Sequence, residues 1–263
     1  MSSTPLTVAS PASTLLHEKL AVVVGASSGM GLASARQLAA QGAEVILVSR
    51  SAANLAAAAA SIRAAVPSAV LTVAPLDCQS HNEAGVRAFF AGLAPRRIDV
   101  LVVTPGASAG AGGFASDTFA TVRLQFEQKF FLQWLVAHAA LPVLSPTASV
   151  TFFSGALARR PGKNSSALAA ANAAVETLTI ALANDLAPIR VNCVSPGLTR
   201  TNAIAPNAPA DVRDGIFNGF GKVVPAGRAG EADDLGHAVV FLATNNWTTG
   251  VVLPVDGGAL VRE

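Results

Sequence analysis

The chain of 263 residues contains no tyrosine, so no phenol can donate or accept a proton in any reaction that it performs. Cysteine is scarce too: Cys78 and Cys193 are the two in the sequence, and each lies in an apolar, strand-like run. Such cysteines predict buried thiols rather than a disulfide framework or a metal site, and they favour a reducing compartment. We therefore expect no bound metal.

Charge is also sparse, with 13% charged residues and a formal net charge of +2. The lysines and arginines are scattered rather than clustered, which argues against nucleic acid as a partner. No apolar run approaches the roughly 18 residues needed to cross a bilayer, so no membrane contact is expected. The hydrophobic share of 51% is large enough to bury a substantial core.

The N-terminal residues are rich in Ser, Thr and Pro and contain no lysine or arginine. They lack the charged start of a secretion signal and the arginines of a transit peptide. We expect a flexible leader over residues 1–17, followed by one domain over residues 18–263, in a cytoplasmic protein.

Strand-like and helix-like segments alternate from residue 19 onward. Apolar, β-branched runs predict strands at residues 19–26, 44–50, 69–77, 98–106, 148–155, 189–197 and 250–258. Helical spacing predicts helices at residues 31–42, 51–66, 81–94, 118–144 and 165 to about 187. This alternation predicts a single-domain, Rossmann-like α/β fold, in which a doubly wound parallel seven-stranded sheet carries helices on both faces.

A glycine-rich turn joins the first predicted strand to the first helix. The segment "VVVGASSGMGLASA" places Gly25, Gly29 and Gly31 where backbone must turn sharply and approach a pyrophosphate at a helix N-terminus. A tight structural turn is the alternative, but the position between strand and helix favours dinucleotide binding. Ser28 and Met30 lie within the same turn and are expected to contact the cofactor.

The glycine spacing, Gly-x-x-x-Gly-x-Gly, resembles that of the short-chain dehydrogenase/reductase family. The resemblance continues over residues 18–261, through "RVNCVSPGLTRT" at residues 190–201 and a C-terminal block at residues 227–258. It implies that Asp77, which ends the third strand, meets the adenine of the cofactor. Further cofactor contacts follow from the matched segments at Thr104, Gly106, Pro196, Gly197, Thr199 and Thr201.

The second predicted strand ends in the segment "VSR". An arginine at this position suits the 2′-phosphate of NADP(H), whereas an acid suits a free ribose hydroxyl. Arg50, with Ser27 and Ser49, therefore predicts NADP(H) as the cofactor. A solvated surface arginine is the alternative.

The resemblance implies a catalytic Asn-Ser-Tyr-Lys tetrad, and this chain departs from it. Ser154 matches the serine, and Lys129 stands where the asparagine belongs. Leu168 and Asn172 occupy the tyrosine and lysine positions. Because a carbonyl that accepts hydride becomes an alkoxide and needs an acid, ordinary alcohol–ketone chemistry is disfavoured. Lys129 could donate that proton or could be an ordinary solvated lysine.

Three functions remain open. The chain resembles degenerate family members of fungal indole-alkaloid pathways, which implies NADPH-dependent reduction of a cyclic iminium, with or without an intramolecular Diels–Alder step. The expected substrate is large, apolar and nitrogen-containing. That subgroup implies a basic residue at the position of Lys129 and an acid near Asn164, which is neutral here. Glu127 and Asp117 are alternative partners for a cation, unless each lies on a solvated helix face. The other two functions are a cyclase or isomerase without redox turnover and a non-catalytic NADP(H) sensor.

A long segment between the sixth strand and the C-terminal block predicts a cover for the substrate. Residues 198–227 contain Gly and Pro together with Ile204, Ile216, Phe217 and Phe220. A loop packed on a neighbouring subunit is the alternative. The family also implies a homodimer or homotetramer, to which the following aromatic residues of the long helix could contribute unless they are core: Phe126, Phe130, Phe131 and Trp134.

Overall fold

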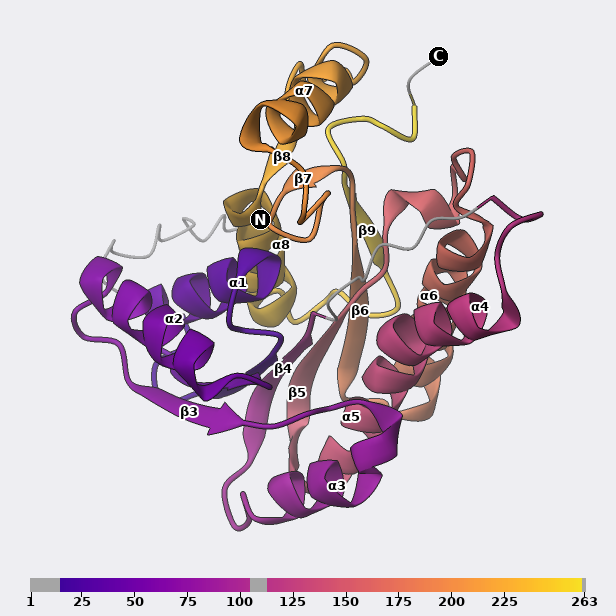
Figure 1. Cartoon of the computed structure of the whole chain (residues 1–263). Helices are drawn as coiled ribbons and strands as arrows, with labels where there is room; N and C mark the ends of the chain where they lie inside the picture. Colours follow the sequence, from indigo (N-terminus) through magenta and orange to yellow (C-terminus); the bar gives the residue numbers. More distant parts are fainter. Residues whose placement is uncertain (1–14, 105–112, 262–263) are drawn as a thin grey trace, which may run out of the picture.

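The computed structural model describes residues 15–104 and 113–261. A seven-stranded parallel sheet in the order β3-β2-β1-β4-β5-β6-β9 forms the centre of the molecule (Figure 1). Its strands are β1 Leu20–Val24, β2 Glu44–Ser49, β3 Leu71–Pro75, β4 Ile98–Val103, β5 Leu144–Phe153, β6 Arg190–Pro196 and β9 Val252–Val255. All seven expected strands are therefore present.

Helices cover both faces of this sheet (Figure 1). One face carries α1 Gly29–Ala40, α2 Ala52–Ala65 and α8 Ala232–Thr244. The other carries α3 Glu83–Ala91, α4 Phe119–Phe126, α5 Leu132–Ala140 and α6 Ser166–Asp185. A further helix, α7 Ala210–Gly221, lies apart from the sheet beside two short strands, β7 Thr199–Arg200 and β8 Gly230–Glu231.

The central strands are buried on both faces, which explains their continuous apolar sequences. Every residue of β1 is buried, and its alternate side chains enter two different cores. Val22 and Val24 face the α3–α5–α6 side, while Ala21 and Val23 face the α1–α2–α8 side. The predicted fold class is confirmed, because a parallel sheet needs helices on both faces.

The strand order reverses direction between β1 and β4. From β1 the chain moves outward through β2 to β3, and then crosses back to β4, β5 and β6. In open α/β sheets the loops that diverge at such a point leave a crevice beyond the carboxyl ends of the strands, where ligands bind. The topology thus sets the location of the site before any side chain is considered.

Two boundaries differ from the sequence-based expectation. The expected helix over residues 118–144 is interrupted by a π-helical turn, Glu127–Phe131, between α4 and α5. Hydrophobic spacing does not reveal such a turn, because one inserted residue barely changes the apolar stripe. The packed domain also reaches back to Leu16, which is buried and whose N–H donates to Gln41 O. Residues 1–14 of the expected leader lie outside the described residues.

Helix α6 is long and apolar enough to cross a membrane by length and composition. This corrects the expectation that no stretch of the chain reaches that length. It is weak evidence for a membrane span, because the core helix of a soluble protein passes the same test. Here α6 contributes Val175 to the core beneath the sheet.

Both cysteines are free and buried, as predicted. Burial raises the pKa of the Cys78 thiol to about 12 and that of Cys193 to about 11. No cluster of metal-ligating side chains occurs within residues 15–104 and 113–261.

Candidate functional site

The glycine-rich turn between β1 and α1 is packed so closely that side chains are excluded from it. Gly25 has a φ of +87°, and a Cβ there would lie 2.0 Å from Thr104 O. A Cβ on Gly31 would lie 2.3 Å from Gly25 O and 2.5 Å from Thr104 Oγ1. Thr104 is itself held by its hydroxyl, which donates to Val24 O at 2.8 Å. The turn therefore opens α1 with bare backbone amides, which suit a phosphate.

A cavity of about 700 Å³ lies against this turn, at the carboxyl ends of the strands. Its lining contains fourteen of the fifteen residues expected to bind the cofactor: Gly25, Ser27, Ser28, Gly29, Met30, Gly31, Ser49, Arg50, Asp77, Thr104, Pro196, Gly197, Thr199 and Thr201. The fifteenth, Gly106, lies outside the described residues. Segments from the whole length of the chain thus meet at one cavity.

Arg50 lies at the border of this cavity, immediately after β2. Its side chain is exposed, and it has no hydrogen-bond or ion-pair partner within the two described ranges. Beside it, the hydroxyls of Ser27 and Ser49 lie 3.0 Å apart. A free guanidinium next to two hydroxyls provides the donors that a phosphate monoester requires.

Asp77 lies at the β3 side of the same cavity. Its carboxylate accepts the N–H of Gln79 at 3.1 Å, and its second oxygen lies 3.5 Å from His81 Nε2. These contacts fix the loop after β3 so that its backbone borders the cavity.

At the opposite side, α6 presents Leu168 and Asn172 to the cavity, one helical turn apart. Asn172 is 2% exposed, and its Oδ1 is buried without a hydrogen-bond partner among the described residues. Since an unpaired buried amide oxygen is costly, this atom is available to accept a hydrogen bond from a bound molecule.

Ser154, at the end of β5, also lines the cavity, and its partner is a residue that the sequence reasoning missed. Its Oγ donates to Glu176 Oε1 at 3.0 Å, while Glu176 Oε2 pairs with Arg159 Nε at 3.0 Å. Glu176 follows Asn172 by one further helical turn, on the same face of α6. That spacing was the available signal for it.

Lys129 reaches the cavity from the π-helical turn. It is 7% exposed, and its Nζ donates to Ser154 O at 2.9 Å and to Phe153 O at 3.4 Å. Burial lowers its pKa to about 8, an effect that the nearby Cys193 thiol partly opposes. The alternative of a solvated lysine is therefore wrong.

The expected acidic partners of a cationic substrate do not reach the cavity. Asn164 is exposed, with a φ of 61°, and does not line it. Asp117 and Glu127 are also absent from the lining, and Glu127 instead accepts a hydrogen bond from Ser80. Glu127 begins the same π-helical turn as Lys129, but its carboxylate pairs with Ser80 instead of lining the cavity.

The segment over residues 198–227 contributes directly to the cavity. Ile204 and Phe220 line it, whereas Phe217 of α7 is buried outside this lining and Ile216 is 40% exposed. Two of the four expected apolar residues therefore face the site.

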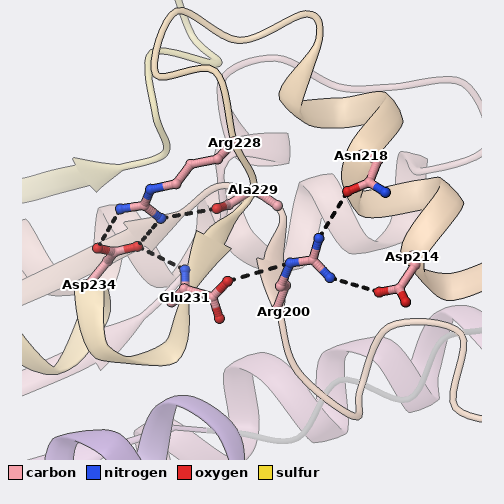
Figure 2. Close-up of polar contacts among 7 residues, drawn as sticks. All are labelled: Arg200, Asp214, Asn218, Arg228, Ala229, Glu231 and Asp234. Carbon is pink, nitrogen blue, oxygen red and sulfur yellow. Dashed lines mark hydrogen bonds and ion pairs between the residues drawn. The ribbon is translucent and has the colours of Figure 1, made fainter. Parts of the chain in front are cut away.

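Arg200 on β7 connects helix α7, within residues 198–227, to strand β8. Figure 2 shows its guanidinium directed toward Asp214 and Asn218 of α7, at 2.8 and 3.1 Å, and toward Glu231 of β8 at 3.4 Å. It also lies over the Phe217 ring, 4.8 Å from the centroid. One residue thus connects α7 to the two short strands next to the cavity.

We expect Arg200→Ala to loosen α7 without unfolding the domain. Because Arg200 is partly exposed, the loss is about 1 kcal/mol, which increases local opening about fivefold. Chymotryptic cleavage after Phe217 should accelerate by that factor. Lys222→Ala, an exposed change on the same segment, should leave the cleavage rate unchanged; equal rates in both variants would contradict the role of Arg200.

The fold and the cavity define a dinucleotide-binding α/β protein. Residues 25–259 match the family model described as enoyl-(acyl carrier protein) reductase. The short-chain dehydrogenase/reductase ATR9 of Stachybotrys chlorohalonatus is 29% identical over 256 residues, covering 92% of this chain and 96% of the relative. The chain belongs to the short-chain dehydrogenase/reductase family, and it is an oxidoreductase of that type.

Two solved structures are also similar. A small-chain dehydrogenase in complex with NADPH is 33% identical, with a TM-score of 0.77, covering 92% of this chain and 98% of the other. The MalC reductase/Diels–Alderase from Malbranchea aurantiaca is 25% identical, with a TM-score of 0.87, covering 95% and 99%.

The described residues fit NADP(H), the cofactor that the similar small-chain dehydrogenase holds. The glycine turn leaves no room for a Cβ beneath the expected pyrophosphate, and Arg50 is free to bind the 2′-phosphate. The unpaired Asn172 Oδ1 belongs to a residue of the same cavity lining and offers an acceptor there.

Proposed function

We propose that the protein is an NADPH-dependent reductase that acts without a phenolic acid. The observation that carries this proposal is Leu168, a hydrocarbon side chain in the lining of an otherwise complete cofactor cavity. Bound NADPH supplies a hydride. The residues of the chain hold the cofactor, exclude water and orient the acceptor.

The sequence-based hypothesis of a cyclic iminium substrate remains a proposal. An iminium carbon is already electrophilic and yields a neutral amine directly, so it needs no proton from residue 168. The resemblance to MalC, named as a reductase and Diels–Alderase, supports a reduction and a cyclisation in one pocket. The apolar residues Leu168, Ile204 and Phe220 would give either substrate a hydrocarbon wall.

The test is a panel of cyclic iminium salts, ketones and conjugated enones, monitored at the NADPH absorbance band. Oxidation of NADPH by any member supports a reductase. Conversion of a tethered diene without NADPH oxidation would instead support a cyclase. Tight NADPH binding without any conversion would favour a sensor.

We expect the protein to bind NADPH at least tenfold more tightly than NADH, because Arg50 can pair with the 2′-phosphate. Arg50→Ala should abolish most of this preference without weakening NADH binding. Fluorescence titration measures both affinities. Arg63→Ala, on α2 away from the cavity, is the matched control, and equal wild-type affinities for both cofactors would refute the assignment.

We propose a homodimer or homotetramer formed through α4, α5 and α6, where Phe131 and Trp134 are 42% and 41% exposed. Phe130 packs against the core instead. No nucleic acid or membrane partner is proposed, and the proposed location is the cytoplasm.

A further inference from the structure

We propose that Lys129 is the proton donor of this site and that the substrate is a neutral carbonyl compound, whose oxygen lies against the Lys129 ammonium. This inference rests on the proposed reductase function and names the substrate class. It replaces the missing phenol with a group that reaches the same cavity from a different helix.

The position of Lys129 is fixed by its backbone and by two acceptors. The π-helical turn places the side chain inward, and its Nζ donates to Ser154 O and Phe153 O. An ammonium has three N–H groups. The third has no acceptor among the described residues, while the side chain lines the cavity. It is therefore available to a bound oxygen.

We call the part of the cavity lined by Lys129, Ser154, Leu168 and Asn172 its reacting end. The other polar groups there either donate their protons to other residues or cannot release a proton. Ser154 donates its hydroxyl proton to Glu176 rather than into the cavity. Asn172 offers an amide, which is not an acid. Arg160, the other cation at this end, donates its Nη1 proton to Ala259 O at 3.1 Å.

The distribution of charge favours a neutral carbonyl over an iminium. Among the described lining residues, Lys129 and Arg160 are the cations beside Ser154, Leu168 and Asn172. The one carboxylate in that lining is Asp77, which follows β3 at the far end of the sheet order. A cationic substrate would meet like charge at the reacting end.

The carbonyl carbon gains a hydride, which brings two electrons from NADPH, and the carbonyl π pair moves onto oxygen. The Nζ–H bond of Lys129 breaks as an O–H bond forms, so that the alcohol and a neutral lysine amine result. For an enone, hydride adds to the β-carbon, the oxygen becomes an enol by the same proton transfer, and the enol tautomerises to the ketone. Water then recharges the amine.

The pH dependence follows from the burial of Lys129, which lowers its pKa to about 8. The protonated form is active, so kcat is constant at lower pH and falls as pH rises through about 8. The titratable group that acts on Lys129 is Cys193 on β6, and Glu176 on α6 acts in turn on Cys193. Burial raises the pKa of Cys193 to about 11, so its thiol stays neutral across this window.

The experiment uses Lys129→Gln, which can still donate to both backbone carbonyls but carries no acidic proton. With trans-1-decalone and 2-cyclohexenone we expect kcat to fall about 100-fold and the break in the pH profile to disappear. The Kd for NADPH should change less than twofold. Lys163→Gln, an exposed change outside the cavity, is the matched control. Lys129→Met provides a second variant if the first fails to fold.

The same variants are assayed with N-methyl-3,4-dihydroisoquinolinium, which needs no proton. In the wild type, reduction of this iminium should be slower than reduction of the ketones. Lys129→Gln should reduce the iminium no more slowly than the wild type does. Unchanged ketone turnover and pH profile in Lys129→Gln would overturn the inference, as would turnover with the iminium probe alone; the proposed reductase function would survive both results. No turnover with any probe would overturn both.

Discussion

Replacing Gly31 with alanine should weaken NADPH binding by about 1,000-fold, because the turn that receives the pyrophosphate has no space for a methyl group. The added Cβ would lie 2.3 Å from Gly25 O and 2.5 Å from Thr104 Oγ1. Neither of these oxygen atoms can move at a low cost in free energy. One belongs to the backbone, and the other is held by its hydrogen bond to Val24 O. The turn must open, and its amides then no longer converge on one phosphate.

The measurement is the thermal shift and fluorescence titration of each variant with NADPH. Gly219→Ala on α7 is the matched control, because a Cβ there meets nothing within 4 Å. Gly29→Ala should have an intermediate effect, since its φ of +55° strains an alanine while its Cβ would lie 3.3 Å from the Thr201 side chain, which can move. A Gly31→Ala protein that binds NADPH normally would show that the pyrophosphate does not lie on this turn.

The cofactor half of the cavity could be predicted from sequence because its determinants are local. Three glycines within seven residues indicate a turn that excludes side chains. Arg50 directly follows the next strand, where an arginine suits the 2′-phosphate of NADP(H). Strand alternation then places these segments at one edge of the sheet. Each inference needs only the order of residues along one or two neighbouring elements.

The reacting half is different, because it is assembled from contacts across the fold. Lys129 on the π-helical turn meets Ser154 O from β5, and Ser154 in turn meets Glu176 on α6. No hydrophobic pattern reveals the inserted residue that turns Lys129 inward. Asn164, the residue nearest to the position of the expected acid, is neutral and exposed. The charged residues that line the cavity with Ser154, Leu168 and Asn172 are the cations Lys129 and Arg160, whereas the carboxylate residue Asp77 lies at the β3 side.

This outcome changes how the missing tyrosine is interpreted. The sequence alone favours a substrate that needs no proton, since neither Leu168 nor Asn172 can supply one. With the buried ammonium of Lys129 as proton donor, the substrate can be one that needs a proton. Its pKa of about 8 lies close to the working pH, where a general acid is most effective. Loss of the Tyr–Lys pair therefore need not mean loss of carbonyl chemistry.

Restoring the pair should rescue an enzyme that has lost Lys129. In a Lys129→Gln background, Leu168→Tyr together with Asn172→Lys should recover most of the roughly 100-fold loss in ketone turnover. Residues 168 and 172 lie one turn apart on α6 and both line the cavity, so a phenol and an ammonium there would face the same substrate. The ammonium introduced at position 172 would lower the pKa of the phenol by its charge.

The matched control carries Leu168→Phe in place of Leu168→Tyr, which differs by one hydroxyl. Steady-state assays with trans-1-decalone should show turnover in the tyrosine variant alone, without the break near pH 8 that marks Lys129 in wild type. Equal rates in the phenylalanine and tyrosine variants would mean that shape rather than acidity limits the reaction. If neither variant turns over while both bind NADPH, the substrate oxygen does not lie between residues 129 and 168. The carbonyl would then have to bind elsewhere in the cavity, because a proton donor is effective only within hydrogen-bond reach of the oxygen that it serves.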